Sequence, residues 1–203
     1  MKTYLWLNSA GHGGMIDDKY VTAPDKMYIF PDGTTIYEGE RNRLLVNFIT
    51  ELGDMDGLWQ YDVTGNSQID VPLPTRTKVA NDLFDRYPNT IYNSFHMNAG
   101  KGIGTEIFTS PGQTASDHHA ALVMDTLEEE IDDLVIRADF SDKDVDKEAK
   151  FWELVKTNCP SWLLEVGFMD DYNNAMLLLD DDYLLSVAKA VHKYRLKAEL
   201  LEI

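Results

Sequence analysis

Short apolar runs along the chain alternate with longer segments in which apolar residues recur every three or four positions. The short runs, bounded by turn-forming residues, indicate buried strands, and the longer spacing indicates helices with one buried face. Strands and helices that alternate in this way are typical of an α/β fold. We therefore predict a largely parallel, twisted sheet flanked by helices on both faces. The expected strands cover residues 4–8, 26–30, 34–37, 58–63, 91–95, 105–109 and 161–166, and the expected helices cover 38–52, the region around 79–84, 115–131 and 181–200.

No repeat, low-complexity tract or linker interrupts the 203 residues, so we expect residues 1–203 to form one domain. A hydrophobic fraction of 44% is ordinary for a protein with a real core. No apolar run is long enough to cross a bilayer, and the apolar stretch at the N-terminus is too short for a signal peptide. The sequence therefore predicts synthesis in the cytoplasm and no transmembrane segment.

The net charge is −17, from 35 acidic and 18 basic residues. Such a surface repels phosphate backbones, so nucleic acid is not an expected partner. The acids concentrate at residues 128–133 and 139–148, which we expect to be solvated. Nothing in the pattern indicates an oligomeric state.

The single cysteine, Cys159, excludes an intramolecular disulfide and a zinc site built from several cysteines. It stands just before an apolar strand, and we expect a buried, inert thiol. A nucleophilic role is the alternative. Pro160 and the absence of a helix beginning after Cys159 remove the usual means of activating a thiolate.

Four residues carry candidate chemistry. His12 lies in a glycine-rich loop after the first strand, and His96 directly follows the strand at 91–95. Glu38 opens a helix after a turn, and Glu165 stands at the end of the strand at 161–166. Ligands of open α/β sheets gather at the carboxyl ends of the strands. The pattern therefore indicates that these side chains share one site.

Two imidazoles and a carboxylate form a known type of catalytic zinc set, which leaves one position for water. A further carboxylate can then move protons during amide hydrolysis. Each residue also has a structural interpretation: a glutamate at a helix start favours the helix dipole, for example. Glu165 is less easily explained in that way, because burying an unpartnered carboxylate is costly. The other histidines, in charged helices, are predicted to be structural or on the surface: His118, His119 and His192.

Three segments of the chain have the form of sequence motifs: Gly11-His12-Gly13-Gly14, Ser94-Phe95-His96-Met97-Asn98-Ala99 and Leu164-Glu165-Val166-Gly167-Phe168. In this order they resemble the motifs of the zinc-dependent N-acetylmuramoyl-L-alanine amidases, a family of cell-wall amidases and phage endolysins. A helix with Arg76, Ala80 and Asn81 and a strand with Gly104 and Glu106 resemble two further elements of that family.

The resemblance implies that residues 1–203 form a catalytic amidase domain that cleaves the bond between N-acetylmuramic acid and L-alanine in peptidoglycan. His12, the glutamate that opens the helix and His96 would bind one Zn²⁺, and Glu165 would be the catalytic acid and base. Asn98 is a candidate substrate contact. The chain departs from the family at Ser9-Ala10, where Asp-Pro is usual, and in a hairpin-like insertion at about 20–37 that we expect to lengthen the rim of the cleft.

Glu38 and Glu40 are both candidates for the third metal ligand. At ~100° per residue, Glu38 shares the inner side of the helix with Leu45 and Ile49, whereas Glu40 points away. Asn42 follows Glu38 by one turn on the same side. We therefore predict Glu38 as the ligand.

Two other functions stay open. A zinc carboxypeptidase acting on wall peptides would use the same residues, and a non-catalytic wall-binding module would share the fold. For delivery, the sequence favours a phage endolysin released from the cytoplasm by a partner, with a truncated secreted enzyme as the alternative.

Overall fold

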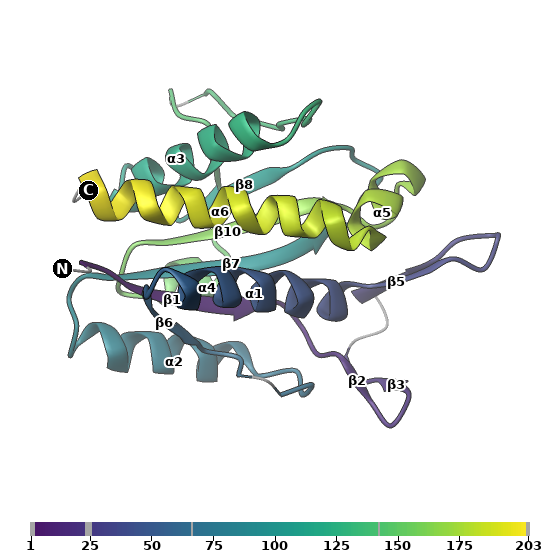
Figure 1. The fold of residues 1–203 in the computed structure, drawn as a ribbon, viewed down its shortest axis with the longest axis horizontal. Coiled ribbons are helices and arrows are strands. Elements are labelled where there is room, and N and C mark those ends of the chain that lie inside the picture. Colours follow the sequence, from purple (N-terminus) through teal and green to yellow (C-terminus); the bar gives the residue numbers. More distant parts are fainter. Residues whose placement is uncertain (1–2, 23–25, 66, 142, 202–203) are drawn as a thin grey trace.

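The computed structural model describes residues 3–22, 26–65, 67–141 and 143–201, and its centre is a six-stranded sheet (Figure 1). The strand order is β6-β1-β7-β10-β8-β9. The first four run parallel, β8 is antiparallel to β10, and β9 runs parallel to β8. The predicted, largely parallel sheet is confirmed. The strand bounds are β1 Leu5–Ala10, β6 Trp59–Asp62, β7 Thr90–Asn98, β8 Glu106–Thr109, β9 Lys147–Glu148 and β10 Ser161–Phe168.

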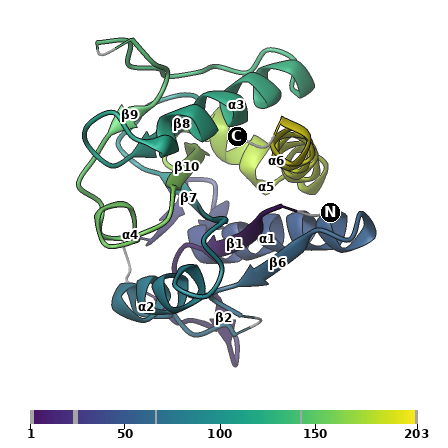
Figure 2. The same cartoon turned by 90° about the vertical axis from the view of Figure 1, so that its left-hand side faces the viewer.

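Helices cover both faces of this sheet, as predicted (Figure 2). Successive side chains of a strand point to opposite faces, so Trp6 packs in the larger core and its neighbours Leu5 and Leu7 in the smaller one. The larger core lies under α1 (Glu38–Met55), α3 (Ala115–Glu130), α5 (Tyr172–Leu179) and α6 (Asp181–Leu201). The other face carries α2 (Leu73–Phe84) and α4 (Trp152–Val155). In the described part of the chain, no helix has the length and apolar character needed to span a membrane.

Two short ribbons leave the sheet at the end toward which β1 and β7 point (Figure 1). β2 (Met15–Ile16) pairs with β3 (Lys19–Tyr20), and β4 (Met27–Ile29) pairs with β5 (Thr35–Tyr37). The second ribbon is the hairpin expected from the sequence, and the first was not expected. Residues 23–25 of the insertion at 20–37 lie outside the described residues.

Two strands extend further than the sequence suggests. The expected strand at 91–95 continues to Asn98, and the expected strand at 161–166 continues to Phe168. His96 and Glu165 therefore lie within strands, and the prediction that they follow or end them was wrong. The expected strands end with the apolar runs at Phe95 and Val166, whereas the backbone pairing of β7 with β10 continues to Asn98 and Phe168. The short elements β9 and α4, and the helix α5, were also not expected.

Not every acid described in the segment at 139–148 is solvated. Asp146 is 2% exposed and accepts a 2.6 Å hydrogen bond from Thr109. Burial raises the pKa of Asp146 to about 6, and the charges of Asp144 and Asp117 add to the rise. The expectation of a fully solvated segment was therefore wrong at this residue.

Asp146→Asn should stabilise the protein near neutral pH. Because the folded-state pKa is raised, folding binds a proton, and stability falls as the pH rises toward and through that pKa. The neutral amide removes this penalty, which we expect to be on the order of 1 kcal/mol at pH 8 and smaller at pH 5. Urea unfolding of both proteins at the two pH values measures it. A gain that does not depend on pH would contradict the assignment.

Candidate metal centre

Three side chains from separate elements converge at the carboxyl end of the sheet. His12 follows β1, Glu38 is the first residue of α1, and His96 lies near the carboxyl end of β7. Oε1 of Glu38 lies 3.2 Å from Nε2 of His12 and 3.1 Å from Nδ1 of His96. The two rings lie nearly perpendicular, with centroids 5.1 Å apart. The three residues predicted as metal ligands are thus brought together.

The donor atoms and their spacing fit a metal ion. Tetrahedral zinc, with bonds of about 2.0–2.1 Å, places its ligand atoms roughly 3.3 Å apart, close to the separations in this site. Within the described ranges, His12, Glu38 and His96 form the group of histidine, cysteine and acidic residues whose donor atoms lie within 4.8 Å of one another. Oε2 of Glu38 is buried without a hydrogen-bond partner, and a cation would satisfy it. These three side chains can therefore hold a metal ion.

The same contacts determine the protonation of the group. Burial alone would raise the pKa of Glu38, but the rings of His12 and His96 outweigh it and hold the pKa well below its usual range. Burial alone would lower the pKa of His96, but Glu153 and Glu38 raise it to about 10. A cation bound between these side chains therefore competes with a proton.

Glycines allow the three elements to approach so closely. A Cβ atom on Gly39 would lie 1.8 Å from the carbonyl oxygen of Gly13, and one on Gly11 would lie 2.4 Å from the ring of His96. His12 itself has a φ of 62°, in the left-handed region that non-glycine residues rarely adopt. Such backbone strain persists where the surroundings enforce it, typically at functional sites.

Two buried side chains of α1 enforce this loop conformation. Nδ2 of Asn42 donates to the carbonyl oxygen of Gly11 at 3.1 Å. The guanidinium of Arg43 donates to the carbonyl oxygens of His12, Gly39, Ser67 and Ile69. The helix therefore carries the carboxylate and also holds the loop that carries the first histidine. Asn42 lies on the side predicted from the helical phase, whereas nothing in the sequence indicated Arg43.

Glu165 lies beside this group, opposite His96 in the register of β7 and β10. Its Oε2 atom is buried and has no hydrogen-bond partner in the described structure. Burial raises the pKa of Glu165 to about 7, and Glu38 adds to the rise, while the charges of His96 and Lys26 oppose it. A carboxyl group with this pKa can both accept and donate a proton near neutral pH.

Asn98, the candidate substrate contact, is partly used within the protein. Its Nδ2 lies 3.3 Å from Oε2 of Glu106, and its Oδ1 accepts a 2.8 Å bond from the backbone N–H of Ala99. Glu106 in turn pairs with Arg137 and, at 3.1 Å, with Lys147. Only the remaining donor and acceptor capacity of the amide can serve a substrate.

The other candidates lie away from the group. Glu40 is not part of the converging set, although it shares the first turn of α1 with Glu38. Nδ1 of His119 lies 3.1 Å from the hydroxyl of Tyr194, and Nε2 of His192 lies 2.7 Å from Oδ2 of Asp56. Burial raises the pKa of the Cys159 thiol to about 12, so this residue lacks the thiolate that a nucleophile requires.

Two carboxylates near the histidines were not found from the sequence. Oε2 of Glu153 lies 3.5 Å from Nε2 of His96, and Oδ2 of Asp70 lies 3.9 Å from Nδ1 of His12. Glu153 belongs to a four-residue helix, and Asp70 to a loop. The only signal for Glu153 was an acidic residue between Trp152 and Leu154, which is weak on its own.

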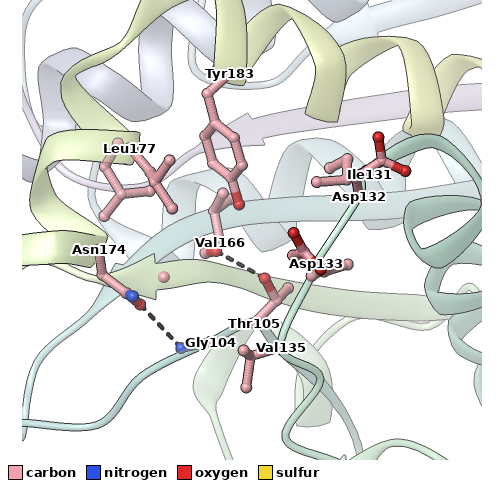
Figure 3. A pocket seen from close by; sticks show the side chains of 13 residues that line it. Gly104, Thr105, Ile131, Asp132, Asp133, Val135, Val166, Asn174, Leu177 and Tyr183 are labelled. Atoms are coloured by element: carbon pink, nitrogen blue, oxygen red, sulfur yellow. Dashed lines mark hydrogen bonds between the residues drawn. The ribbon is translucent and has the colours of Figure 1, made fainter.

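A cavity of about 240 Å³ lies elsewhere, next to β10, α5 and the start of α6 (Figure 3). Val166 lines it, and its side chain faces away from that of the preceding Glu165 because neighbours on a strand alternate. Hydrogen bonds from Gly104 to Asn174 and from Thr105 to Val166 close part of its wall (Figure 3). None of the converging residues lines this cavity, so it is separate from the candidate metal centre.

The sequence matches a family model over nearly its whole length. The model of N-acetylmuramoyl-L-alanine amidases, Amidase_3, covers residues 9–194. The chain belongs to this amidase family. Among curated amidases, CwlM of Bacillus licheniformis is 36% identical over 119 residues, which make up 59% of this chain and 43% of CwlM.

Solved amidase structures share the fold. The amidase AmiC2 of Nostoc punctiforme superposes with a TM-score of 0.74 at 21% identity, over 99% of this chain and 98% of that one. The amidase Ami1 of Mycobacterium smegmatis gives 0.77 at 18% identity, over 98% of each chain. At these identities the likeness supports the amidase fold and leaves the site to be argued from its own geometry.

Proposed function

We propose that this amidase hydrolyses the bond between N-acetylmuramic acid and L-alanine in peptidoglycan, with one zinc ion held by His12, Glu38 and His96. The observation that carries the proposal is the convergence of two imidazoles and a carboxylate beside Glu165, in a chain of the amidase family. Residues 1–203 would act as one catalytic domain.

A zinc ion held by these side chains would polarise the scissile carbonyl and lower the pKa of the attacking water. Glu165 takes the proton of that water and returns it to the leaving nitrogen. Glu165 lies opposite His96 on the neighbouring strand, and its buried Oε2 atom, which has no hydrogen-bond partner in the described structure, is available for that proton. Asn98 sits two residues beyond His96, where its spare hydrogen-bonding capacity can contact the wall peptide.

Digestion of purified peptidoglycan, with and without a strong chelator, tests both the requirement for zinc and the identity of the cleaved bond. The protein should carry about one zinc per chain, and digestion should raise free amino groups without raising reducing sugar ends. Chelation should stop digestion until zinc is returned. Full activity in the presence of chelator would refute the catalytic role of the metal. Release of a terminal D-amino acid would favour the carboxypeptidase, and binding without cleavage would favour the wall-binding module.

For delivery, we propose release from the cytoplasm by a phage-encoded partner. The sequence pattern supports this route, as does the location of the wall outside the cell membrane. Production of the protein inside a bacterial cell should leave that cell intact until its membrane is permeabilised. Lysis without permeabilisation would contradict this route and leave the enzymatic proposal standing.

A further inference from the structure

The two ring nitrogens of His96 face different carboxylates. Nδ1 lies 3.1 Å from Oε1 of Glu38, and Nε2 lies 3.5 Å from Oε2 of Glu153. Nε2 is buried and makes no hydrogen bond to another group in the described part of the chain. Glu153 is therefore the acceptor available to a proton on Nε2, while Nδ1 faces the metal-binding group.

Glu153 is held firmly by the groups around it. It is 3% exposed, and its Oε1 accepts a 3.0 Å hydrogen bond from Ser9 and another from the hydroxyl of Tyr92. Ser94 donates to Oε2 at 3.4 Å, and Nη1 of Arg76 lies 3.6 Å from Oε1. With so many donors directed at it, the carboxylate has few alternative orientations.

His12 shows a looser version of the same arrangement. Its Nε2 faces Glu38, and its Nδ1 lies 3.9 Å from Oδ2 of Asp70. Nη2 of Arg76 lies 3.3 Å from Oδ1 of that aspartate. Arg76, which is 1% exposed, thus lies between the carboxylates behind both rings.

We infer that Glu153 is a positioning residue that keeps the proton of His96 on Nε2, so that Nδ1 is free for the metal ion, and that Arg76 links it to the carboxylate behind His12. The inference rests on the proposed ligand role of His96. A neutral imidazole carries its proton on either nitrogen, and only one tautomer can bind through Nδ1. Partners of this kind typically contribute about 10–100-fold to metal affinity.

The protonation state of the two ring nitrogens of His96 tests the inference directly. In the zinc-loaded full chain, ¹⁵N NMR of the histidine rings should show Nε2 of His96 protonated and Nδ1 bound to metal. Zinc on Nε2 would overturn the inference but not the proposed function. A chain that takes up no zinc would instead refute the metal role on which the inference rests.

The affinity of the chain for zinc gives the second test. Glu153→Gln should weaken zinc binding by about 10–100-fold in competition with a fluorescent chelator. The matched control is Asp146→Asn, which also neutralises a buried carboxylate bonded to a hydroxyl but lies outside the site, and it should bind zinc as the native chain does. Unchanged affinity in Glu153→Gln would overturn the inference. If circular dichroism shows that Glu153→Gln is unfolded, the NMR result decides.

Discussion

Glu165→Gln should lower turnover by roughly 10²–10⁴-fold while the protein keeps its full zinc content. Glutamine has nearly the same shape as glutamate but cannot take a proton from water or return one to the leaving nitrogen. Glu165 is also not one of the three side chains whose donor atoms converge. The measurement is the rate of amine release from peptidoglycan beside zinc content by elemental analysis.

Two results would contradict this assignment. Normal turnover in Glu165→Gln would remove the proposed proton transfer and with it the mechanism. Loss of zinc along with activity would instead make Glu165 a ligand, although its carboxylate is not in the converging group.

Glu38→Ala should lose zinc together with activity, and excess zinc should restore part of the activity. The variant removes the carboxylate whose Oε1 atom lies 3.2 Å from the ring of His12 and 3.1 Å from the ring of His96. We expect zinc affinity to fall by more than the roughly 10–100-fold that an outer partner contributes. Zinc titration followed by the peptidoglycan assay at each zinc level measures both effects.

Glu40→Ala is the matched control, because it removes a carboxylate from the same first turn of α1. It should leave zinc content and turnover unchanged. Loss of zinc in Glu40→Ala, with zinc retained in Glu38→Ala, would show that the third ligand was assigned wrongly while the amidase function survives.

The sequence was most informative where local pattern determines structure. Helix α1 begins at the predicted Glu38, because the change from a turn to helical spacing is abrupt there. The helical phase then placed Glu38 rather than Glu40 toward the histidines. The sheet was also predictable, since the large apolar residues of the strands around Trp6 and Phe95 are buried on both faces.

The residues that hold the candidate ligands in position could not be predicted in the same way. Glu153 follows His96 by 57 positions in the sequence and reaches it only through tertiary packing, and its own helix has four residues. Arg43 looks like a surface residue of an amphipathic helix, yet it donates to three carbonyl oxygens of two loops and to one of its own helix. Neither contact leaves a periodic pattern in the sequence, so a single sequence does not reveal it.

The three converging side chains come from separate segments of the chain, and this affects the stability of the fold. His12 and His96 belong to different segments, and an ion bound to both would close a loop of roughly 80 residues. Because these side chains come together only in the folded chain, the ion would bind the folded state and stabilise it by mass action. Scarcity of the ion would then loosen the part of the molecule that holds β1, α1 and β7 together, in addition to halting hydrolysis. The concentration of zinc would thereby affect both the stability of the folded protein and its rate of hydrolysis.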